Sequence, residues 1–192
     1  MEVTFGYLFV RFESFRKRYS LKMDKRKEID KELREFLAGK NTWRILWKFF
    51  KKVQREAEEF KVYDSQIWTC GPCACLAKAL CTWIGKDVSI YALCQKNESS
   101  EAFHLLVRVG DFYLDGDGVS SSEEIFKRWS KNLVEDLTLV PFENHMWPQD
   151  FYSARYEELH VIRPLIKMME RGLDRSSFMQ LGPVAVLYEL EI

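Results

Sequence analysis

The sequence lacks several features that would assign a function class directly. No apolar stretch approaches the length of a membrane span, and the amino-terminal residues lack the basic and then apolar layout of a secretory signal. There is no internal repeat, no compositionally disordered segment and no glycine-rich phosphate loop. These absences argue against a membrane-spanning protein, an exported protein, a repeat architecture and a P-loop nucleotide-binding protein.

Charge is balanced overall but unevenly distributed along the chain. Residues 1–60 carry 16 Lys or Arg against 10 Asp or Glu, and the remaining residues carry 13 against 19. We therefore expect the basic front and the acidic back to attract each other. With 192 residues and 47% hydrophobic content, the chain can bury a core. We predict a basic helical extension over 1–60, packed on a core formed by 61–192.

Five cysteines cluster between residues 70 and 94. An odd number of cysteines without an export signal favours reduced thiols and a cytoplasmic location. A disulfide that joins Cys70 to another cysteine is the alternative.

Cys73 follows a Gly-Pro turn and opens a run of helix formers. Pro72 suits the first helical position, where its missing N–H costs nothing. Cys73 would then lie in the first turn, where unpaired N–H groups and the helix dipole favour a thiolate, the nucleophilic form. Apolar residues at helical spacing give this helix a face for the core: Leu76, Ala77, Leu80, and Trp83 or Ile84.

A histidine and two aspartates follow on a predicted hairpin. Two β-rich runs flank Gly110-Asp111, which reads as a two-residue turn. If Val109 pairs with the first residue after that turn, His104 lies opposite Asp117 and diagonal to Asp115, with all three side chains on one face. Either carboxylate could orient the imidazole toward the thiol, and we favour Asp115, with Asp117 as the alternative.

Residues from about 66 to 130 resemble the papain-like and transglutaminase-like cysteine hydrolases. The run Cys-Gly-Pro-Cys-Ala is similar to the papain signature, in which the second cysteine, here Cys73, is catalytic. That resemblance implies a His on one strand and an Asp on the next, matching His104 and Asp115, and it makes Gln66 the candidate oxyanion donor. Within the superfamily, the stretches around these residues look most like small hydrolase-like proteins of prokaryotes and their viruses.

The expected fold is therefore α+β and papain-like, with the nucleophile helix packed on an antiparallel sheet. Cys73 would attack an amide, isopeptide or ester carbonyl, His104 would transfer the proton, and Asp115 would orient His104. The substrate would be a peptide, a protein or a small amide. The hypothesis needs no cofactor and no metal.

There are three interpretations other than a cysteine hydrolase. Trp-Thr-Cys-Gly-Pro-Cys also resembles the thioredoxin site, in which Cys70 and Cys73 would form a redox pair. Thr69 interrupts that motif, and no proline follows about forty residues on. A metal site on Cys70, Cys73 and Cys75 lacks the further ligands of a familiar zinc spacing. The third interpretation is a noncatalytic binding module on a hydrolase fold.

The basic front is predicted to hold a β segment over Val3–Phe12, a helix over Asp24–Leu37, and a second helix from Asn41 or Thr42. Aromatic and aliphatic residues line one face of the second helix: Trp43, Leu46, Trp47, Phe50, Val53, Ala57 and Phe60. Such a stripe is more often a packed face than a membrane or partner surface. Nucleic-acid binding through this helix is therefore a second, less favoured interpretation.

Four elements are expected after the hairpin. A capping box at Ser121-Ser122-Glu123-Glu124 predicts a helix over Ser122–Ser130. A strand over Leu137–Val140, a helix over Val161–Arg171 and a terminal strand over Val184–Tyr188 follow. His145 and Trp147 lie in an aromatic loop between them and could line a cleft.

Overall fold

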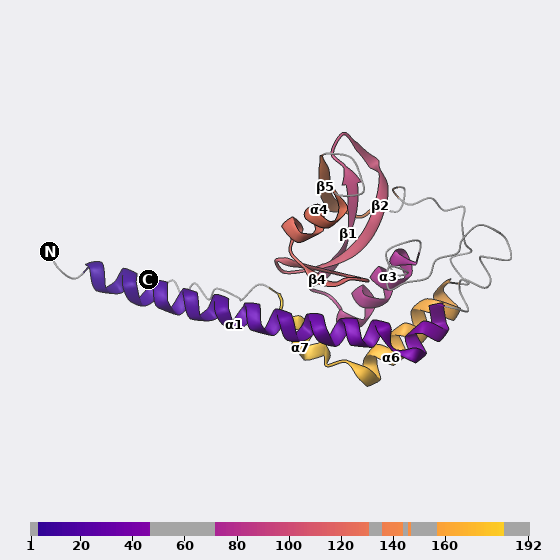
Figure 1. Ribbon diagram of the computed structural model, residues 1–192, viewed down its shortest axis with the longest axis horizontal. Coiled ribbons are helices and arrows are strands. Elements are labelled where there is room, and N and C mark those ends of the chain that lie inside the picture. Colours follow the sequence, from indigo (N-terminus) through magenta and orange to yellow (C-terminus); the bar gives the residue numbers. More distant parts are fainter. Residues whose placement is uncertain (1–3, 47–71, 131–135, 144–145, 147–156, 183–192) are drawn as a thin grey trace.

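A computed structural model describes residues 4–46, 72–130, 136–143, 146 and 157–182 (Figure 1). The helices are α1 Thr4–Ala38, α3 Cys73–Ile84, α4 Ser122–Trp129, the π-helical turn η4 Glu158–Ile162, α6 Arg163–Gly172 and α7 Arg175–Met179. The strands are β1 Val88–Gln95, β2 Glu98–Val109, β3 Phe112–Asp115, β4 Gly118–Ser120 and β5 Leu137–Pro141. They form one antiparallel sheet in the order β4-β3-β2-β1-β5, which confirms the α+β prediction.

The predicted hairpin is present in the predicted register. Val109 pairs with Phe112, which leaves Gly110 and Asp111 as the two-residue turn between β2 and β3. Gly110 has a φ of 60° and no other residue of the turn has a positive φ. That pattern matches a type II′ turn, which places Gly at its first central position.

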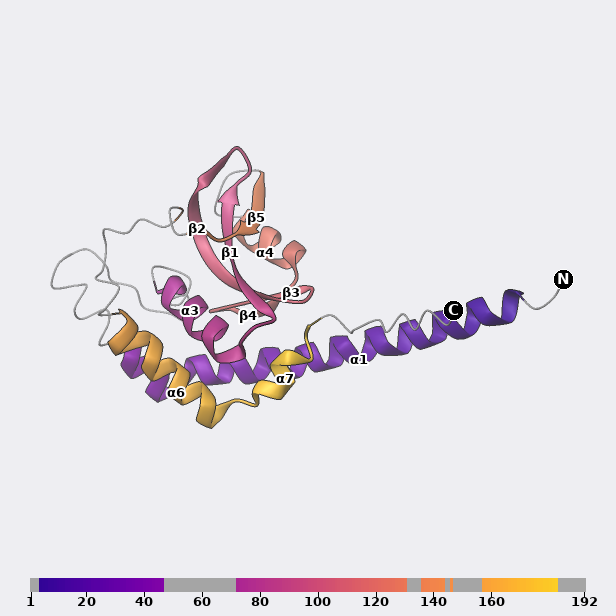
Figure 2. The same ribbon diagram turned by 180° about the vertical axis from the view of Figure 1, so that it is seen from behind.

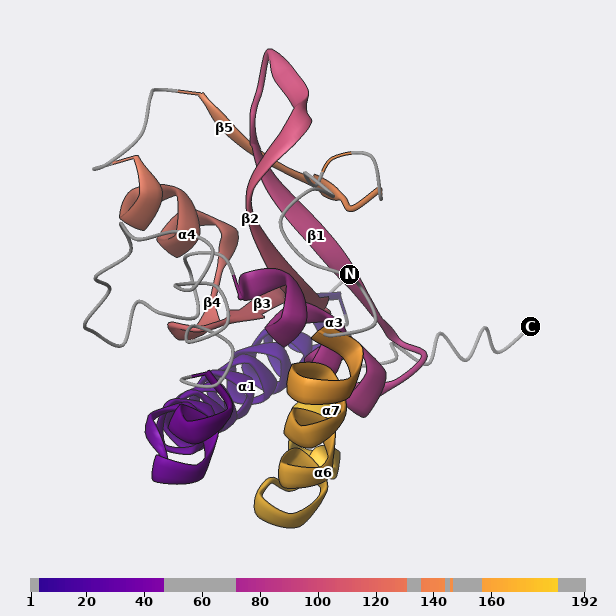
Figure 3. The same cartoon turned by 90° about the vertical axis from the view of Figure 1, so that its right-hand side faces the viewer.

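The sheet separates two hydrophobic clusters, because successive residues of a strand point to opposite faces. Leu105, Val107 and Val109 of β2 belong to the main core, which also contains α3. Leu106 points the other way and packs in a smaller cluster with Ile125 of α4. The helix α3 lies between the sheet and the layer formed by α1, α6 and α7, while α4 lies beside the sheet away from α3 (Figures 1 and 3).

Helix α3 begins at Cys73, directly after Pro72, and the whole predicted apolar face is buried. The buried residues are Leu76, Ala77, Leu80, Trp83 and Ile84. Near the end of α3, the ring of Trp83 meets that of Phe178 from α7 edge to face, with centroids 5.1 Å apart. Packing on both sides therefore fixes α3, and with it the position of Cys73.

Helix α1 is much longer than predicted, and the β segment over Val3–Phe12 was wrong for the described residues from Thr4 onward. Aromatic and β-branched residues favoured a strand there. The apolar residues of the same run also recur at helical spacing, at Phe5, Leu8, Phe9 and Phe12. No proline and no pair of glycines interrupts the run, so the helix continues through it. Helix α1 ends at Ala38, directly before Gly39, as predicted.

The carboxyl-terminal part of α1 packs on the core, with Ile29 and Leu33 fully buried. Lys22 lies 2.7 Å from Asp111 at the hairpin turn, and Arg26 pairs with Glu124 of α4. These ion pairs join the basic front to the acidic back. The amino-terminal part of α1 extends away from the sheet and the other helices (Figures 1 and 2).

The second predicted helix is described only over residues 40–46, which are helical. Leu46 is buried, whereas Trp43 on the same predicted stripe is 39% exposed. The stripe residues from Trp47 to Phe60 lie outside the described part of the chain. None of the described helices is both long and apolar enough to cross a membrane.

The later elements agree closely with expectation. Ser121 caps α4 and Glu124 reaches back to the Ser121 N–H, which confirms the capping box. The predicted strand is β5, and the predicted helix near Val161 begins with η4 and continues as α6. The strand β1, the short strand β4 and α7 were not predicted. The segment Val184–Tyr188 lies outside the described residues.

Candidate active site

His104 and Asp115 form a buried hydrogen-bonded pair. Nε2 of His104 is 3.1 Å from Oδ2 of Asp115, and the two residues are 0% and 2% exposed. His104 lies on β2 and Asp115 is the last residue of β3, so the β2–β3 hairpin brings them together. The structure thus resolves the choice left open by the sequence: Asp115 is the aspartate that contacts the imidazole.

The Asp115 carboxylate is held from three sides. Besides His104, Nη2 of Arg128 lies 2.7 Å from Oδ2, and the backbone N–H of Asp117 donates to Oδ1 at 2.9 Å. Burial alone would raise the pKa of Asp115, but the His104 hydrogen bond and the charges of His104 and Arg128 lower it below its usual value. Asp115 is therefore an ionised carboxylate in the interior at neutral pH.

His104 is strongly basic for a buried histidine. Burial lowers its pKa, but the hydrogen bond with Asp115 and the neighbouring Cys73 thiol outweigh this and raise the pKa to about 9. Nδ1, the other ring nitrogen, is buried and makes no hydrogen bond of ordinary geometry among the described residues. Cys73 and His104 are therefore neighbours without a hydrogen bond of ordinary geometry between them.

The three predicted residues are thus assembled around one imidazole. Cys73 occupies the first turn of α3 and is 2% exposed. The first backbone N–H groups of a helix have no partner within the helix, and the N–H of Cys73 in the first turn of α3 is one of these groups. The arrangement supplies a thiol, a base and a carboxylate in the order that nucleophilic catalysis by cysteine requires.

A β-bulge directly precedes His104. Leu93 of β1 pairs with His104, whereas the next residue, Cys94, pairs with Ala102, so that Phe103 is the extra residue on β2. Bulges bend a strand, increase its twist and redirect neighbouring side chains, and they are frequent next to active sites. Phe103 is 40% exposed while His104 is fully buried. The irregular pairing therefore lies at the point where β2 presents its candidate base.

Arg128 and Trp129 complete this environment, and the sequence analysis missed both as site residues. Both come from the last turn of α4. The ring of Trp129 stacks on that of His104, with centroids 5.0 Å apart and an interplanar angle of 29°. The capping box at Ser121 was the sequence signal that could have found both residues. It starts α4 shortly after Asp115, and because this helix is short, its last turn lies beside the hairpin.

Asp117, the alternative orienter, contacts Arg128 instead of His104. Its Oδ2 lies 3.3 Å from Nε of Arg128. Burial and the charge of Asp115 raise the pKa of Asp117, and Arg128 opposes the increase. Asp117 thus contacts Asp115 through its backbone N–H and Arg128 through its carboxylate.

The other candidate residues divide into two groups. Gln66, Cys70, His145 and Trp147 lie outside the described residues. Cys75 is buried, and burial followed by the charge of Glu157 raises the pKa of its thiol far above the usual range. Cys75 is therefore a neutral core residue. Cys73, Cys75, Cys81 and Cys94 are free thiols.

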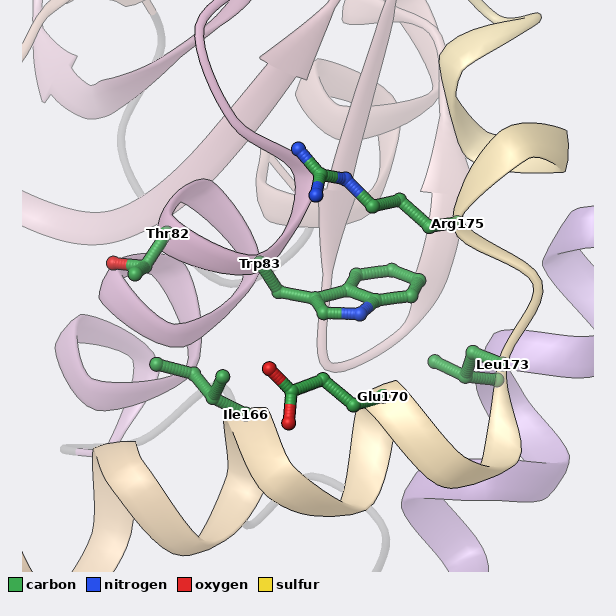
Figure 4. Close-up of a pocket in the computed structure, with 6 residues that line it drawn as sticks. All are labelled: Thr82, Trp83, Ile166, Glu170, Leu173 and Arg175. Atoms are coloured by element: carbon green, nitrogen blue, oxygen red, sulfur yellow. The ribbon is translucent and has the colours of Figure 1, made fainter.

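A cavity of about 320 Å³ lies at the opposite end of α3 (Figure 4). Trp83 lies between the side chains of Arg175 and Glu170 in this view. The remaining lining residues are Thr82, Ile166 and Leu173. Ten residues of helix separate Cys73 from Trp83, about 15 Å along the axis. The lining includes none of Cys73, His104 and Asp115, so the cavity is not part of the candidate site.

Across the described ranges, no group of three or more His, Cys, Asp or Glu side chains is arranged to hold a metal ion. Comparisons of the chain with protein-family models, curated proteins and solved structures gave no match.

Proposed function

We propose that this protein is a cysteine-dependent hydrolase or acyl transferase of papain-like fold. It acts on an amide, isopeptide or ester bond through Cys73, His104 and Asp115. The observation that carries the proposal is a buried imidazole that interacts with the Cys73 thiol. Its Nε2 is held by Asp115, and its Nδ1 has no hydrogen-bond partner among the described residues. A histidine with a merely structural role would be expected to have both nitrogens satisfied, because an unpaired buried polar atom is costly.

The charge state of the pair supports the same chemistry. With a pKa raised to about 9, His104 is an imidazolium at neutral pH and can stabilise a thiolate on Cys73. In the first step the Cys73 sulfur attacks the carbonyl carbon and forms a thioester. His104 donates its proton to the departing nitrogen or oxygen as the C–N or C–O bond breaks.

The second step releases the acyl group. Water, or an amine or alcohol in the acyl-transfer case, attacks the thioester and gives a proton to His104, while the C–S bond breaks and the Cys73 thiolate is restored. The backbone N–H of Cys73, at the start of α3, would stabilise the oxyanion in both steps. Gln66 stays a proposed second donor.

The thiol must be reduced to act, and the described cysteines are free. A cytoplasm keeps thiols in that state, so we propose a cytoplasmic location and a peptide, protein or small amide as substrate.

The test is the pH dependence of iodoacetamide labelling, located by mass spectrometry, in the reduced wild type and in Cys70→Ser and His104→Ala variants. We expect Cys73 to react rapidly well below the pH at which an ordinary thiol ionises, to keep that rate in Cys70→Ser and to lose it in His104→Ala. Cys81, which is less buried and lies away from His104, is the internal control.

Two results contradict the proposal. A Cys73 rate that does not depend on His104 removes the thiolate–imidazolium pair. If the Cys73 rate depends on Cys70 instead, the result favours the redox interpretation. If neither variant changes the rate, the result favours a noncatalytic binding module. With the expected result, amide and ester substrates are the next compounds to screen.

A further inference from the structure

Asp115 has a cationic partner that a Cys-His-Asp arrangement does not itself require. Nη2 of Arg128 lies 2.7 Å from Oδ2 of Asp115, the same oxygen that His104 contacts at 3.1 Å. Nε of Arg128 lies 3.3 Å from Asp117. One guanidinium therefore bridges two carboxylates, of which one is fully buried and contacts the imidazole.

We propose that Arg128 is a positioning residue: its guanidinium keeps Asp115 ionised and fixed in orientation, so that His104 directs Nδ1 toward Cys73. This inference rests on the proposed function, since it assigns the residue that acts through Asp115 on the same site.

An interior carboxylate is costly. Asp115 is 2% exposed, and a buried carboxylate is neutralised unless partners compensate for lost hydration. His104 compensates only while it is protonated or donates its N–H. Arg128 is charged at every relevant pH, so its contribution persists when His104 loses its proton during the reaction.

The contacts of Asp115 also fix its orientation. Oδ2 accepts from both His104 and Arg128, while Oδ1 accepts from the Asp117 N–H, so both oxygens are fixed. Rotation of the carboxylate would break contacts with both partners. Because Nε2 of His104 is tied to that oxygen, the orientation of the whole imidazole depends on it.

The charged neighbours of Asp115 come from three elements. They are His104 on β2, Arg128 on α4 and Asp117 in the turn after β3, with Arg34 of α1 acting on Asp117. Cys73 of α3 interacts with His104 and not with Asp115 itself. Among the described residues, Arg128 is the permanent cation that directly contacts Asp115, so its removal raises the pH at which Asp115 takes up a proton.

The experiment compares Arg128→Met with Arg128→Lys, which keeps the charge. Arg108→Met is the control: Arg108 lies on β2, is exposed and bonds Tyr91 at 2.9 Å on the sheet surface. The first readout is the pH below which the rate of Cys73 labelling by iodoacetamide falls. We expect Arg128→Met to move it upward by about one pH unit or more, Arg128→Lys to restore most of that shift, and Arg108→Met to leave it unchanged.

A second readout separates this inference from the proposed function. The Nε2-bound proton of His104, followed by NMR, reports the loss of its Asp115 acceptor on acidification whether or not Cys73 is a nucleophile. In Arg128→Met this transition should also move upward in pH. If wild-type Cys73 labelling ignores His104, the proposed function fails while this titration still tests Arg128.

The inference is overturned if Arg128→Met melts at a lower temperature but keeps wild-type labelling and NMR transitions, because Arg128 would then have a structural role alone. If Arg128→Met does not fold, Arg128→Gln replaces it, since glutamine donates a hydrogen bond without the charge. Wild-type transitions in that variant overturn the inference equally.

Discussion

Nε2 of His104 and Oδ2 of Asp115 lie 3.1 Å apart in the interior, on strands joined by a two-residue turn. The short connection places Asp115 and His104 on one hairpin. The thiol, by contrast, reaches the imidazole from a helix that precedes both strands. The integrity of the pair and the approach of Cys73 can therefore be tested separately.

The first prediction concerns the two aspartates. Asp115→Asn leaves Arg128 and His104 without their shared carboxylate, and removal of one partner from a buried ion pair costs about 3–5 kcal/mol of unfolding free energy. Asp117→Asn keeps the backbone N–H that Asp115 uses and removes only a partly exposed contact, so the loss is about 1 kcal/mol or less. Urea unfolding measures both, and equal losses would contradict the assignment of Asp115 as the central acceptor.

The second prediction concerns pH and stability. The pKa of His104 is raised from 6.5 to about 9 on folding, so His104 stabilises the fold fully below pH 6.5 and loses this contribution as the pH rises through 9. The titration of one group can change the free energy of unfolding by at most about 1.4 kcal/mol per pH unit. Urea unfolding of the wild type and of His104→Gln at pH 6, 7.5 and 9 should show a difference that shrinks with pH. A difference that stays constant would contradict a raised pKa.

The third prediction concerns the hairpin turn. A Cβ at Gly110 would lie 2.5 Å from the carbonyl oxygen of Leu181, and its φ of +60° disfavours other residues. We expect Gly110→Ala to lower the unfolding free energy by about 1–3 kcal/mol. In the matched variant Gly172→Ala, the new Cβ meets only the Phe36 ring, at 3.6 Å. Thermal unfolding should rank the variants in this order, and a stable Gly110→Ala would argue against the turn.

The fourth prediction concerns the attachment of α1. Leu33 is fully buried in the main core, and Leu33→Ala should cost about 2–5 kcal/mol through the cavity it leaves. Lys31, two positions earlier, is exposed and pairs loosely with Glu35 at 3.8 Å. Lys31→Ala should therefore change the free energy by no more than about 0.5 kcal/mol. Similar small effects for both variants would mean that α1 does not pack on the core.

Sequence patterns predicted the parts of the site that depend on local chemistry. The Gly-Pro turn placed Cys73 at a helix start, and Gly110-Asp111 set the register that brings Asp115 toward His104. The capping box at Ser121 placed α4. In each case a few adjacent residues determine the structure, so local propensity is sufficient.

Other parts depend on contacts between distant segments, which a single sequence does not display. In the sequence, Arg128 is an ordinary basic residue at the end of a helix. Only the fold shows that it contacts Asp115. The strand β1 was missed although it pairs on both sides, because its role depends on β2 and β5. The amino-terminal run after Val3 satisfied both strand and helix patterns, and the continuity of α1 decided between them.

The sequence separation of the α1 contacts has a consequence for how the protein folds. Lys22 and Asp111 are 89 residues apart, Arg26 and Val119 are 93 apart, and Glu32 meets the backbone of Asp174 across 142 residues. A chain with such non-local contacts closes large loops before it gains their energy and tends to fold slowly. In a growing chain α1 is made before β4 and α7, so its docking on the core has to wait for those later segments.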